Sequence, residues 1–292
     1  MDIITLQAPA KINLGLDVLK RLPNGYHALR MIMQTLTLFD EVTTEKRGDY
    51  SDIVLDTLGN TIPGLCSAED NIVYKAAVLL KKEYQISDGI HITLRKRIPV
   101  AAGMAGGSTD CAATLRGINT IFGLNLSVDQ LCAHGVKLGA DVPYCILQGT
   151  ALSEGIGEKL TPLPACPPYY IVLVKPDIDV STKYVYEHLT LDETTSHPDI
   201  DGMASAIRDG NSLGILSRLG NVLETVTQTG YPIIAELKSF LLEHGAAGAL
   251  MSGSGPTVFA LFEEKEKAGQ ALDALQNTYP DYASFLVTPY NP

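Results

Sequence analysis

The sequence predicts an α+β fold in two domains, and three observations support this. The chain has 292 residues, which is more than a single hydrophobic core usually organises. Apolar and polar residues alternate in some stretches, as in half-buried strands, and apolar residues recur every three or four positions in others, as in amphipathic helices. Prolines at 162, 164, 167 and 168 mark a seam. We therefore expect one domain over residues 1–163 and a second over residues 164–292.

Strand patterns dominate the first part of the chain. Residues 3–8 and 12–19 are each predicted to form a strand, and Pro9-Ala10-Lys11 is expected to connect the two. Turn-forming residues at 21–25 then lead into another strand-like stretch over residues 31–38, and shorter strands follow it. The first domain should therefore be rich in strands, with helices on one side.

A glycine-rich stretch from Pro99 to Asp110 joins a strand around residues 90–94 to a helix. Ser108, Thr109 and Asp110 are expected to mark the start of that helix. The first N–H groups of a helix have no intrahelical partner and carry partial positive charge, so the glycines favour a phosphate site, with Ser108 nearest the phosphate or its magnesium ion. The alternative is an ordinary turn that needs glycine only for positive φ.

Helix signals flank this stretch on both sides. Ser67-Ala-Glu-Asp70 is expected to open one helix, with Asn71 in its first turn, and Ser127-Val-Asp-Gln130 forms a capping box for another that ends at Gly139. Asp141 follows, where a helix cap or turn residue is the ordinary interpretation and a catalytic carboxylate is the alternative. Residues 144–152 have the pattern of a strand.

The second half mixes buried strands with helices, which predicts a small α+β sandwich. Residues 252–257, Ser-Gly-Ser-Gly-Pro-Thr, are either a tight hairpin turn or a second functional loop. Strands are expected at 169–174, 249–251, 258–262 and 285–287, and helices at 183–189, 212–227, 233–244 and from 266.

Composition limits the partners. The chain is 46% hydrophobic and 19% charged, as globular proteins are, and its net charge of −11 argues against nucleic acid or an anionic membrane as a partner. Arg95, Lys96 and Arg97 precede the glycine-rich stretch and are expected to form a solvated strand end, with direct contact to a phosphate as the alternative. Five cysteines without a Cys-x-x-Cys pair, a leader or a long apolar run fit reduced thiols in the cytoplasm, with no zinc site.

Three stretches, Pro9–Leu14, Pro99–Asp110 and Ser252–Thr257, resemble the three motifs of the galactokinase, homoserine kinase, mevalonate kinase and phosphomevalonate kinase (GHMP) superfamily. The resemblance spans nearly the whole chain. Gly25-Tyr-His and Gly139-Ala-Asp-Val-Pro resemble, more specifically, a branch whose acceptor alcohol carries a cytidylyl group. Ala105 and Thr109 depart from the glycine and serine that the family often has there.

The resemblance implies an N-terminal domain like the second domain of ribosomal protein S5 and a ferredoxin-like C-terminal domain. It implies transfer of a phosphoryl group from ATP, with magnesium, to an alcohol of a small molecule. Lys11 and Asp141 would be catalytic, with Asp141 receiving the proton of the attacking hydroxyl. The substrate would be bound by Asn13, Tyr26, His27 and Thr182. ATP would be bound by Asn71, Pro99, Val100, Ala101, Ala102, Gly103, Met104, Ala105, Gly106, Gly107, Ser108 and Thr109.

Two alternatives stay open from the sequence. One is another small-alcohol kinase of the superfamily, acting on homoserine, mevalonate or a sugar, which is favoured if Tyr26 and His27 are only structural. The other is a nucleotide-binding sensor that has lost phosphotransfer. The presence of both Lys11 and Asp141 argues against the sensor.

Overall fold

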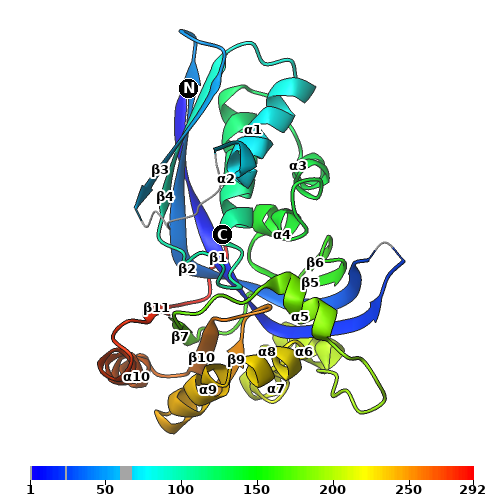
Figure 1. Ribbon diagram of the computed structural model, residues 1–292, viewed down its shortest axis with the longest axis vertical. Coiled ribbons are helices and arrows are strands. Elements are labelled where there is room, and N and C mark those ends of the chain that lie inside the picture. Colours follow the sequence, from blue (N-terminus) through cyan, green and yellow to red (C-terminus); the bar gives the residue numbers. More distant parts are fainter. Residues whose placement is uncertain (1, 24, 60–67) are drawn as a thin grey trace. The chain divides into compact units, whose positions relative to one another are not determined.

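The computed structural model describes residues 2–23, 25–59 and 68–292 (Figure 1). The chain divides into two compact units that are discontinuous in sequence, whereas the predicted boundary follows sequence order and places residues 148–163 in the first domain. The first unit contains residues 1–10, 38–100 and 105–147, and the second contains residues 11–37, 101–104 and 148–292.

Two long neighbouring strands, β1 (Ile3–Arg21) and β2 (His27–Arg47), contribute residues to both units. The predicted connector at Pro9-Ala10-Lys11 is wrong, because β1 runs through it without a break. The N–H of Lys11 donates to the carbonyl of Met104 at 3.1 Å, so at this point one side of β1 faces a loop. Pro9, two residues earlier, has its nitrogen on that same side of the strand. Proline has no N–H to donate, and on a side that faces a loop no neighbouring strand requires one.

The first unit packs four helices on one side of its strands (Figure 1). β4 (Gly89–Lys96) pairs antiparallel with β2 and parallel with β3 (Ile53–Gly59), and every second residue of β4 is buried. A short 3₁₀ turn, η1 (Ala68–Asp70), comes before the helices. These helices are α1 (Ile72–Glu83), α2 (Gly106–Ile121), α3 (Val128–Gly135) and α4 (Val142–Leu147).

Several helix boundaries differ from the predictions. α2 begins at Gly106 rather than at Ser108, because the left-handed residue Ala105 (φ +56°) begins the helix without a side-chain cap. α3 has the predicted capping box but ends at Gly135. The strand predicted over 144–152 is wrong in its first part, which is α4. Tyr144, Cys145 and Ile146 are buried one after another, and such a run does not distinguish a buried strand from a buried helix.

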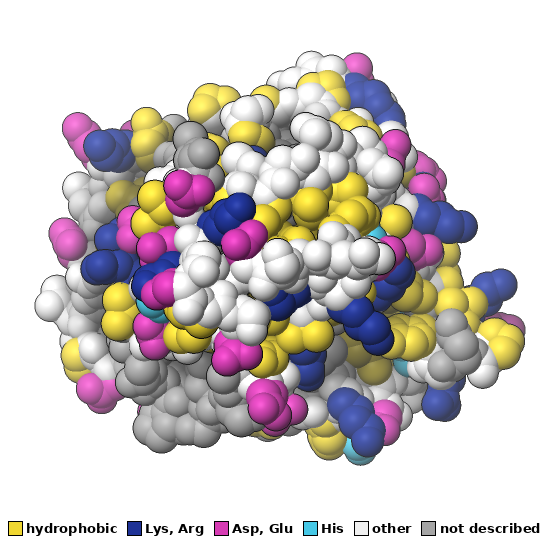
Figure 2. Space-filling view, turned by 90° about the horizontal axis from the view of Figure 1, so that it is seen from above, with side chains coloured by type: hydrophobic (Ala, Val, Ile, Leu, Met, Phe, Trp, Pro, Cys, Tyr) yellow, Lys and Arg dark blue, Asp and Glu magenta, His cyan; other side chains and the backbone are white. Residues whose placement is uncertain are grey.

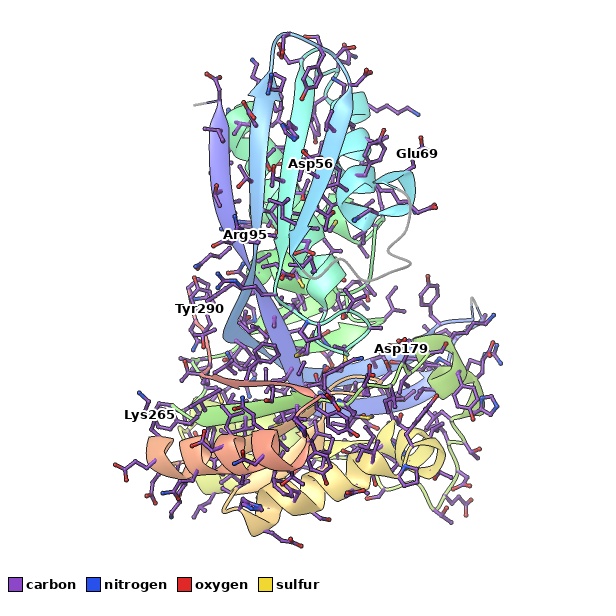
Figure 3. The ribbon with its side chains drawn as sticks, turned by 60° about the vertical axis from the view of Figure 1, so that its left-hand side comes forward. Asp56, Glu69, Arg95, Asp179, Lys265 and Tyr290 are labelled. Carbon is purple, nitrogen blue, oxygen red and sulfur yellow. The ribbon has the colours of Figure 1, made fainter. Side chains whose placement is uncertain are left out.

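In the second unit, short strands pair beside β1 and β2 and add to their sheet. β5 (Thr150–Gly155) pairs antiparallel with β2 and with β6 (Lys159–Pro162). β8 (Gly220–Asn221) pairs parallel with β1 through Gly15 and Leu16. The end of the chain also joins this unit, since the N–H of Tyr290, labelled in Figure 3, donates to the carbonyl of Thr35 at 2.8 Å.

The rest of the second unit is a four-stranded antiparallel sheet with the order β11-β7-β10-β9. If the four strands of this sheet are numbered 1 to 4 along the chain, their order is 4-1-3-2, the ferredoxin-like arrangement that the resemblance implies. Two helices, α9 (Ile233–Glu243) and α10 (Lys265–Thr278), lie on one face of the sheet (Figure 1). The strands are β7 (Tyr170–Lys175), β9 (Gly248–Met251), β10 (Val258–Phe262) and β11 (Ala283–Val287).

Four shorter helices lie between β7 and α9 along the chain. The single helix predicted over 212–227 is wrong, because β8 divides that segment into two helices. β8 forms through pairing with β1, a distant partner that no local pattern reveals. The helices are α5 (Thr182–His188), α6 (Ile200–Arg208), which the sequence did not lead us to expect, α7 (Ser212–Leu216) and α8 (Glu224–Gly230).

Across the described residues, no helix is both long and apolar enough to cross a membrane. The cysteines at 111, 132, 145 and 166 form no disulfide, and Cys66 lies outside the described residues. Figure 2 shows basic side chains scattered among acidic and apolar ones on the face in view. Positive charge on this face is therefore not gathered into one broad patch.

Candidate functional site

The backbone carbonyl of Gly103 is the point where three stretches of the second unit meet. It accepts hydrogen bonds from Nζ of Lys11 and from Oγ of Ser252, each at 3.0 Å. Nζ of Lys11 also donates to Oδ1 of Asn13 at 2.8 Å. The lysine is 4% exposed and the asparagine 1% exposed. One hydrogen-bonded group therefore joins the glycine-rich stretch, Lys11 and Asn13 of β1, and the loop between β9 and β10.

The glycines at this meeting point are required by close backbone contact. Gly103 has φ +71°, and a Cβ on it would lie 2.2 Å from the carbonyl oxygen of Ser252. Gly253 has φ +59°, and a Cβ on it would lie 3.2 Å from the carbonyl oxygen of Gly103. Both residues thus combine a left-handed backbone with a close approach of two chain segments, which only glycine accommodates without strain. The hairpin interpretation of 252–257 is correct as geometry, but the loop also contacts the glycine-rich stretch.

Asn221 of β8 holds the loop between β9 and β10 in place. Its Nδ2 donates to the carbonyls of Met251 and Gly253, each at 2.8 Å, and its Oδ1 accepts the N–H of Leu223. Thr182, at the start of α5, exchanges a 2.9 Å hydrogen bond with Ser254 of the same loop. Thr182, a residue expected at the substrate, is thus attached to the loop that supports Gly103.

The N-terminal turn of α2 in the first unit contains two glycines with different surroundings. A Cβ on Gly106 would lie 3.2 Å from Ile98 and 3.3 Å from Nζ of Lys96, so packing favours glycine there. Among the described residues, a Cβ on Gly107 would meet only a methyl group of Ile72, at 3.7 Å, and Gly107 is exposed. The packing of the described residues therefore does not require glycine at 107, whereas a ligand approaching the helix N-terminus would.

The backbone that leads into α2 contains three residues with positive φ. Ala101, Gly103 and Ala105 have φ of +53°, +71° and +56°, so left-handed residues occur at every second position. Alternation of this kind turns successive N–H groups toward a common side and forms the concave nests that bind anions. Ala101 and Ala105 adopt this conformation without being glycine, which is uncommon and is concentrated at functional sites.

Three other predicted residues, Asn71, Ser108 and Asp141, belong to the first unit. The side chain of Asn71 is the N-cap of α1, accepting the N–H of Val73 at 2.9 Å, rather than a residue of that helix's first turn. Oγ of Ser108 lies 3.9 Å from the position of a Cβ on Gly139. Asp141 comes directly before α4, and its carbonyl accepts the N–H of Cys145. Ser108 is therefore adjacent to the turn that carries Asp141.

The solvated strand end expected at residues 95–97 is wrong for Lys96. Its side chain is only 5% exposed and contacts the carboxylates of Asp40 and Asp110. Arg95 does follow the expectation, with a side chain that is 57% exposed. Neighbouring residues of a strand point to opposite faces, so in β4 Lys96 points to the buried side and Arg95 to the exposed one.

Tyr26 lies directly before β2, and His27 is the first residue of that strand. Tyr26 is 57% exposed, and the ring of His27 stacks on that of Tyr186 in α5, with centroids 5.0 Å apart and planes at 28°. Burial, and secondly the charge of Arg21, lower the pKa of His27, so its imidazole is neutral near pH 7. Sequence inspection did not select Tyr186, because its aromatic partner lies far away along the chain. An exposed aromatic ring beside a stacked pair is suited to binding a planar group.

Two family models match the chain. The model described as GHMP kinases N terminal domain matches residues 71–149, and the one described as GHMP kinases C terminal matches residues 203–281.

Curated relatives match over nearly the full length. The chain is 57% identical to a 4-diphosphocytidyl-2-C-methyl-D-erythritol kinase from Lachnoclostridium phytofermentans, over 93% of this chain and 92% of the relative. It is 48% identical to the protein of the same name from Enterococcus faecalis, over 94% of this chain and 95% of the relative.

Solved structures are also similar to this chain over nearly its full length. A crystal structure of 4-(cytidine 5'-diphospho)-2C-methyl-D-erythritol kinase superimposes with a TM-score of 0.82 at 30% identity, covering 99% of this chain and all of that one. A homoserine kinase from Cytophaga hutchinsonii superimposes almost as well, with a TM-score of 0.81 at 21% identity, covering 99% of this chain and 95% of that one. The second likeness shows a shared fold.

Substitutions at Gly107 and at Gly103 separate ligand binding from folding. Gly107→Val should fold normally, since Gly107 is exposed and valine and glycine differ by less than about 0.5 kcal/mol in helix propensity. Its branched side chain should obstruct phosphate binding and abolish the ATP-dependent rise in unfolding temperature. Gly103→Ala should instead lower the unfolding temperature of the ligand-free protein, because its Cβ would meet Ser252. Normal ATP affinity in folded Gly107→Val protein would contradict the phosphate site.

Proposed function

We propose that this chain, which belongs to the GHMP kinase family, transfers the γ-phosphoryl group of ATP to the 2-hydroxyl of 4-diphosphocytidyl-2-C-methyl-D-erythritol. The reaction yields the 2-phosphate and ADP and belongs to the non-mevalonate route to isoprenoid precursors. One observation carries the proposal: the chain is 57% identical to a kinase of that name over 93% of its length. We place the reaction in the cytoplasm.

The triphosphate of ATP is assigned to the glycine-rich stretch. The supporting features are the left-handed backbone at Ala101, Gly103 and Ala105 and the exposed glycine at position 107. N–H groups at a helix N-terminus bind phosphate oxygens without the reorganisation that water requires. In phosphoryl transfer the protein does little covalent chemistry, so this positioning and charge stabilisation make up most of its contribution.

Magnesium is assigned to the same turn. In the described part of the chain, no three His, Cys, Asp or Glu side chains are grouped to hold a metal ion. Mg²⁺ commonly keeps several waters and is bound by one or two protein oxygens together with substrate phosphates. We assign the Ser108 hydroxyl as a protein oxygen available to it. When bound, the ion neutralises charge on the β- and γ-phosphates.

Asp141 and Lys11 are assigned to the chemical step. Asp141 would orient the acceptor hydroxyl and take its proton as the oxygen attacks the γ-phosphorus. Lys11 would offset negative charge on the transferring group. Support for Lys11 comes from its burial and from its bond to Gly103, which hold the ammonium at the edge of the assigned phosphate loop.

A coupled assay of ADP formation tests the function directly. The protein should turn over 4-diphosphocytidyl-2-C-methyl-D-erythritol with MgATP and give little turnover with homoserine, mevalonate or galactose. Faster turnover of one of those alcohols would assign the chain to another branch of the family. No ADP formation with any acceptor, while ATP still binds, would support a nucleotide sensor.

The paired roles of Asp141 and Lys11 predict strongly non-additive kinetics. Asp141→Asn keeps the shape of the side chain and removes its charge, so kcat should fall about 10²- to 10⁴-fold with little change in ATP affinity. Lys11→Met should lose a comparable factor, and the double variant much less than the product of the two. Near-normal turnover by Asp141→Asn would reduce Asp141 to a turn residue.

His27 is predicted to select the acceptor rather than ATP. A site built to hydrogen-bond a base discriminates strongly, because its polar atoms are otherwise left unpaired. His27→Ala should raise KM for the cytidylyl acceptor and leave KM for ATP unchanged.

In the wild-type protein the acceptor KM should change little with pH above 6.5, because the lowered pKa keeps His27 neutral there, and should rise only in more acidic buffer. Equal losses for both substrates in His27→Ala would indicate a structural histidine.

A further inference from the structure

A buried ion cluster lies beneath the N-terminal turn of α2. Lys96, the last residue of β4, places its ammonium between the carboxylates of Asp40 in β2 and Asp110 in α2, with Nζ 2.6 Å from Oδ2 of Asp110. The three side chains are 5%, 0% and 2% exposed, respectively. All three residues belong to the first unit.

The cluster ties together the two ends of the glycine-rich stretch. Oδ1 of Asp40 accepts the backbone N–H groups of Arg97 and Ile98, which immediately precede Pro99. Its Oδ2 accepts a hydrogen bond from Nζ of Lys96. Lys96 also donates to Asp110, the fifth residue of α2. The strand end and the first turns of the helix are thus held by one ammonium.

In the cluster, one ammonium lies between two carboxyl groups. The two carboxylates outweigh the effect of burial and raise the pKa of Lys96, so it is charged at neutral pH. Burial, with a further contribution from Asp40, raises the pKa of Asp110 well above its usual value even though Lys96 opposes the shift. Within the described residues, Oδ1 of Asp110 accepts no hydrogen bond. Asp110 therefore contributes to the cluster through one oxygen, Oδ2, which accepts the hydrogen bond from Lys96.

The ammonium lies close to the assigned phosphate site. A Cβ on Gly106, the first residue of α2, would be 3.3 Å from Nζ of Lys96. A buried charge is screened by salt far less than an exposed one, so it acts over the few ångströms to the helix terminus. The first N–H groups of the helix and the Lys96 charge therefore favour an anion at the same place.

We propose that Lys96 is a positioning residue for ATP, which fixes the loop and first turn of α2 through Asp40 and Asp110 and adds positive charge beneath the triphosphate, an assignment that rests on the proposed function. Asp110 serves as a hydrogen-bond acceptor for Lys96, and its own negative charge is not needed.

Two variants that differ only at Lys96 test this. Asp110→Asn keeps a side-chain oxygen for Lys96, so its dissociation constant for MgATP should stay within about twofold of the wild-type value. Lys96→Met/Asp110→Asn removes the ammonium and leaves Asp40 as the remaining carboxylate of the cluster, still bonded to two N–H groups, so the protein should fold. Its dissociation constant should rise at least about tenfold, with the acceptor KM unchanged.

Arg95→Met is the matched control. It removes the same charge from the neighbouring residue of β4, where the side chain is exposed at the outer side of the sheet (Figure 3). Its affinity for MgATP should equal that of the wild type. Isothermal titration calorimetry measures the binding, and unfolding temperatures without ATP report stability separately.

The possible failures are distinguishable. Equal ATP affinity in Asp110→Asn and in the double variant would overturn the role of Lys96 and leave the function intact. A tenfold loss in Asp110→Asn alone would show that the charge of Asp110, rather than its acceptor oxygen, is required. If the wild-type protein does not bind MgATP, the proposed function itself fails.

Discussion

The carbonyl oxygen of Gly103 is the acceptor around which three stretches of the second unit are organised. It receives Lys11 and Ser252 at once, and this is only achievable because Gly103 has no Cβ to collide with the Ser252 carbonyl. The loop that carries Ser252 depends in turn on Asn221, in a strand that pairs with β1. Since β1 also carries Lys11, one strand positions both donors of the Gly103 carbonyl.

Glycines that look equivalent in the sequence have different physical roles. Gly103 is required where another part of the chain approaches closely, and packing favours glycine at 106, whereas a Cβ on Gly107 would make only an ordinary contact with Ile72 among the described residues. An exposed glycine at a helix N-terminus allows a ligand to reach the backbone N–H groups, which a side chain would cover. The assigned phosphate loop therefore combines glycines that permit close packing with a glycine that leaves the N–H groups accessible.

The net charge of −11 and the binding of a polyanion are compatible because the relevant charges are local. Exposed charges farther than about 8 Å are largely screened at physiological salt. The helix N-terminus and Lys96 are close to the assigned phosphate site, and the Lys96 side chain is poorly reached by water. Lys96 also shows why a run of three basic residues is not one feature: in a strand, alternate side chains belong to opposite faces.

The sequence by itself determined the elements whose patterns are local: the alternating strand β4, the capping box of α3, the helix behind the glycine-rich stretch, and the strands and helices of the ferredoxin-like sheet. The motifs of the family were also legible in it. Only the tertiary structure decided that β1 is continuous through Pro9, that β8 exists, that Lys96 is buried, and that Gly103 receives Lys11 and Ser252. The reason is distance along the chain, since those two donors are 92 and 149 residues away from Gly103. Periodicity reports which face of an element is buried, but the partner that covers the face is chosen by the fold.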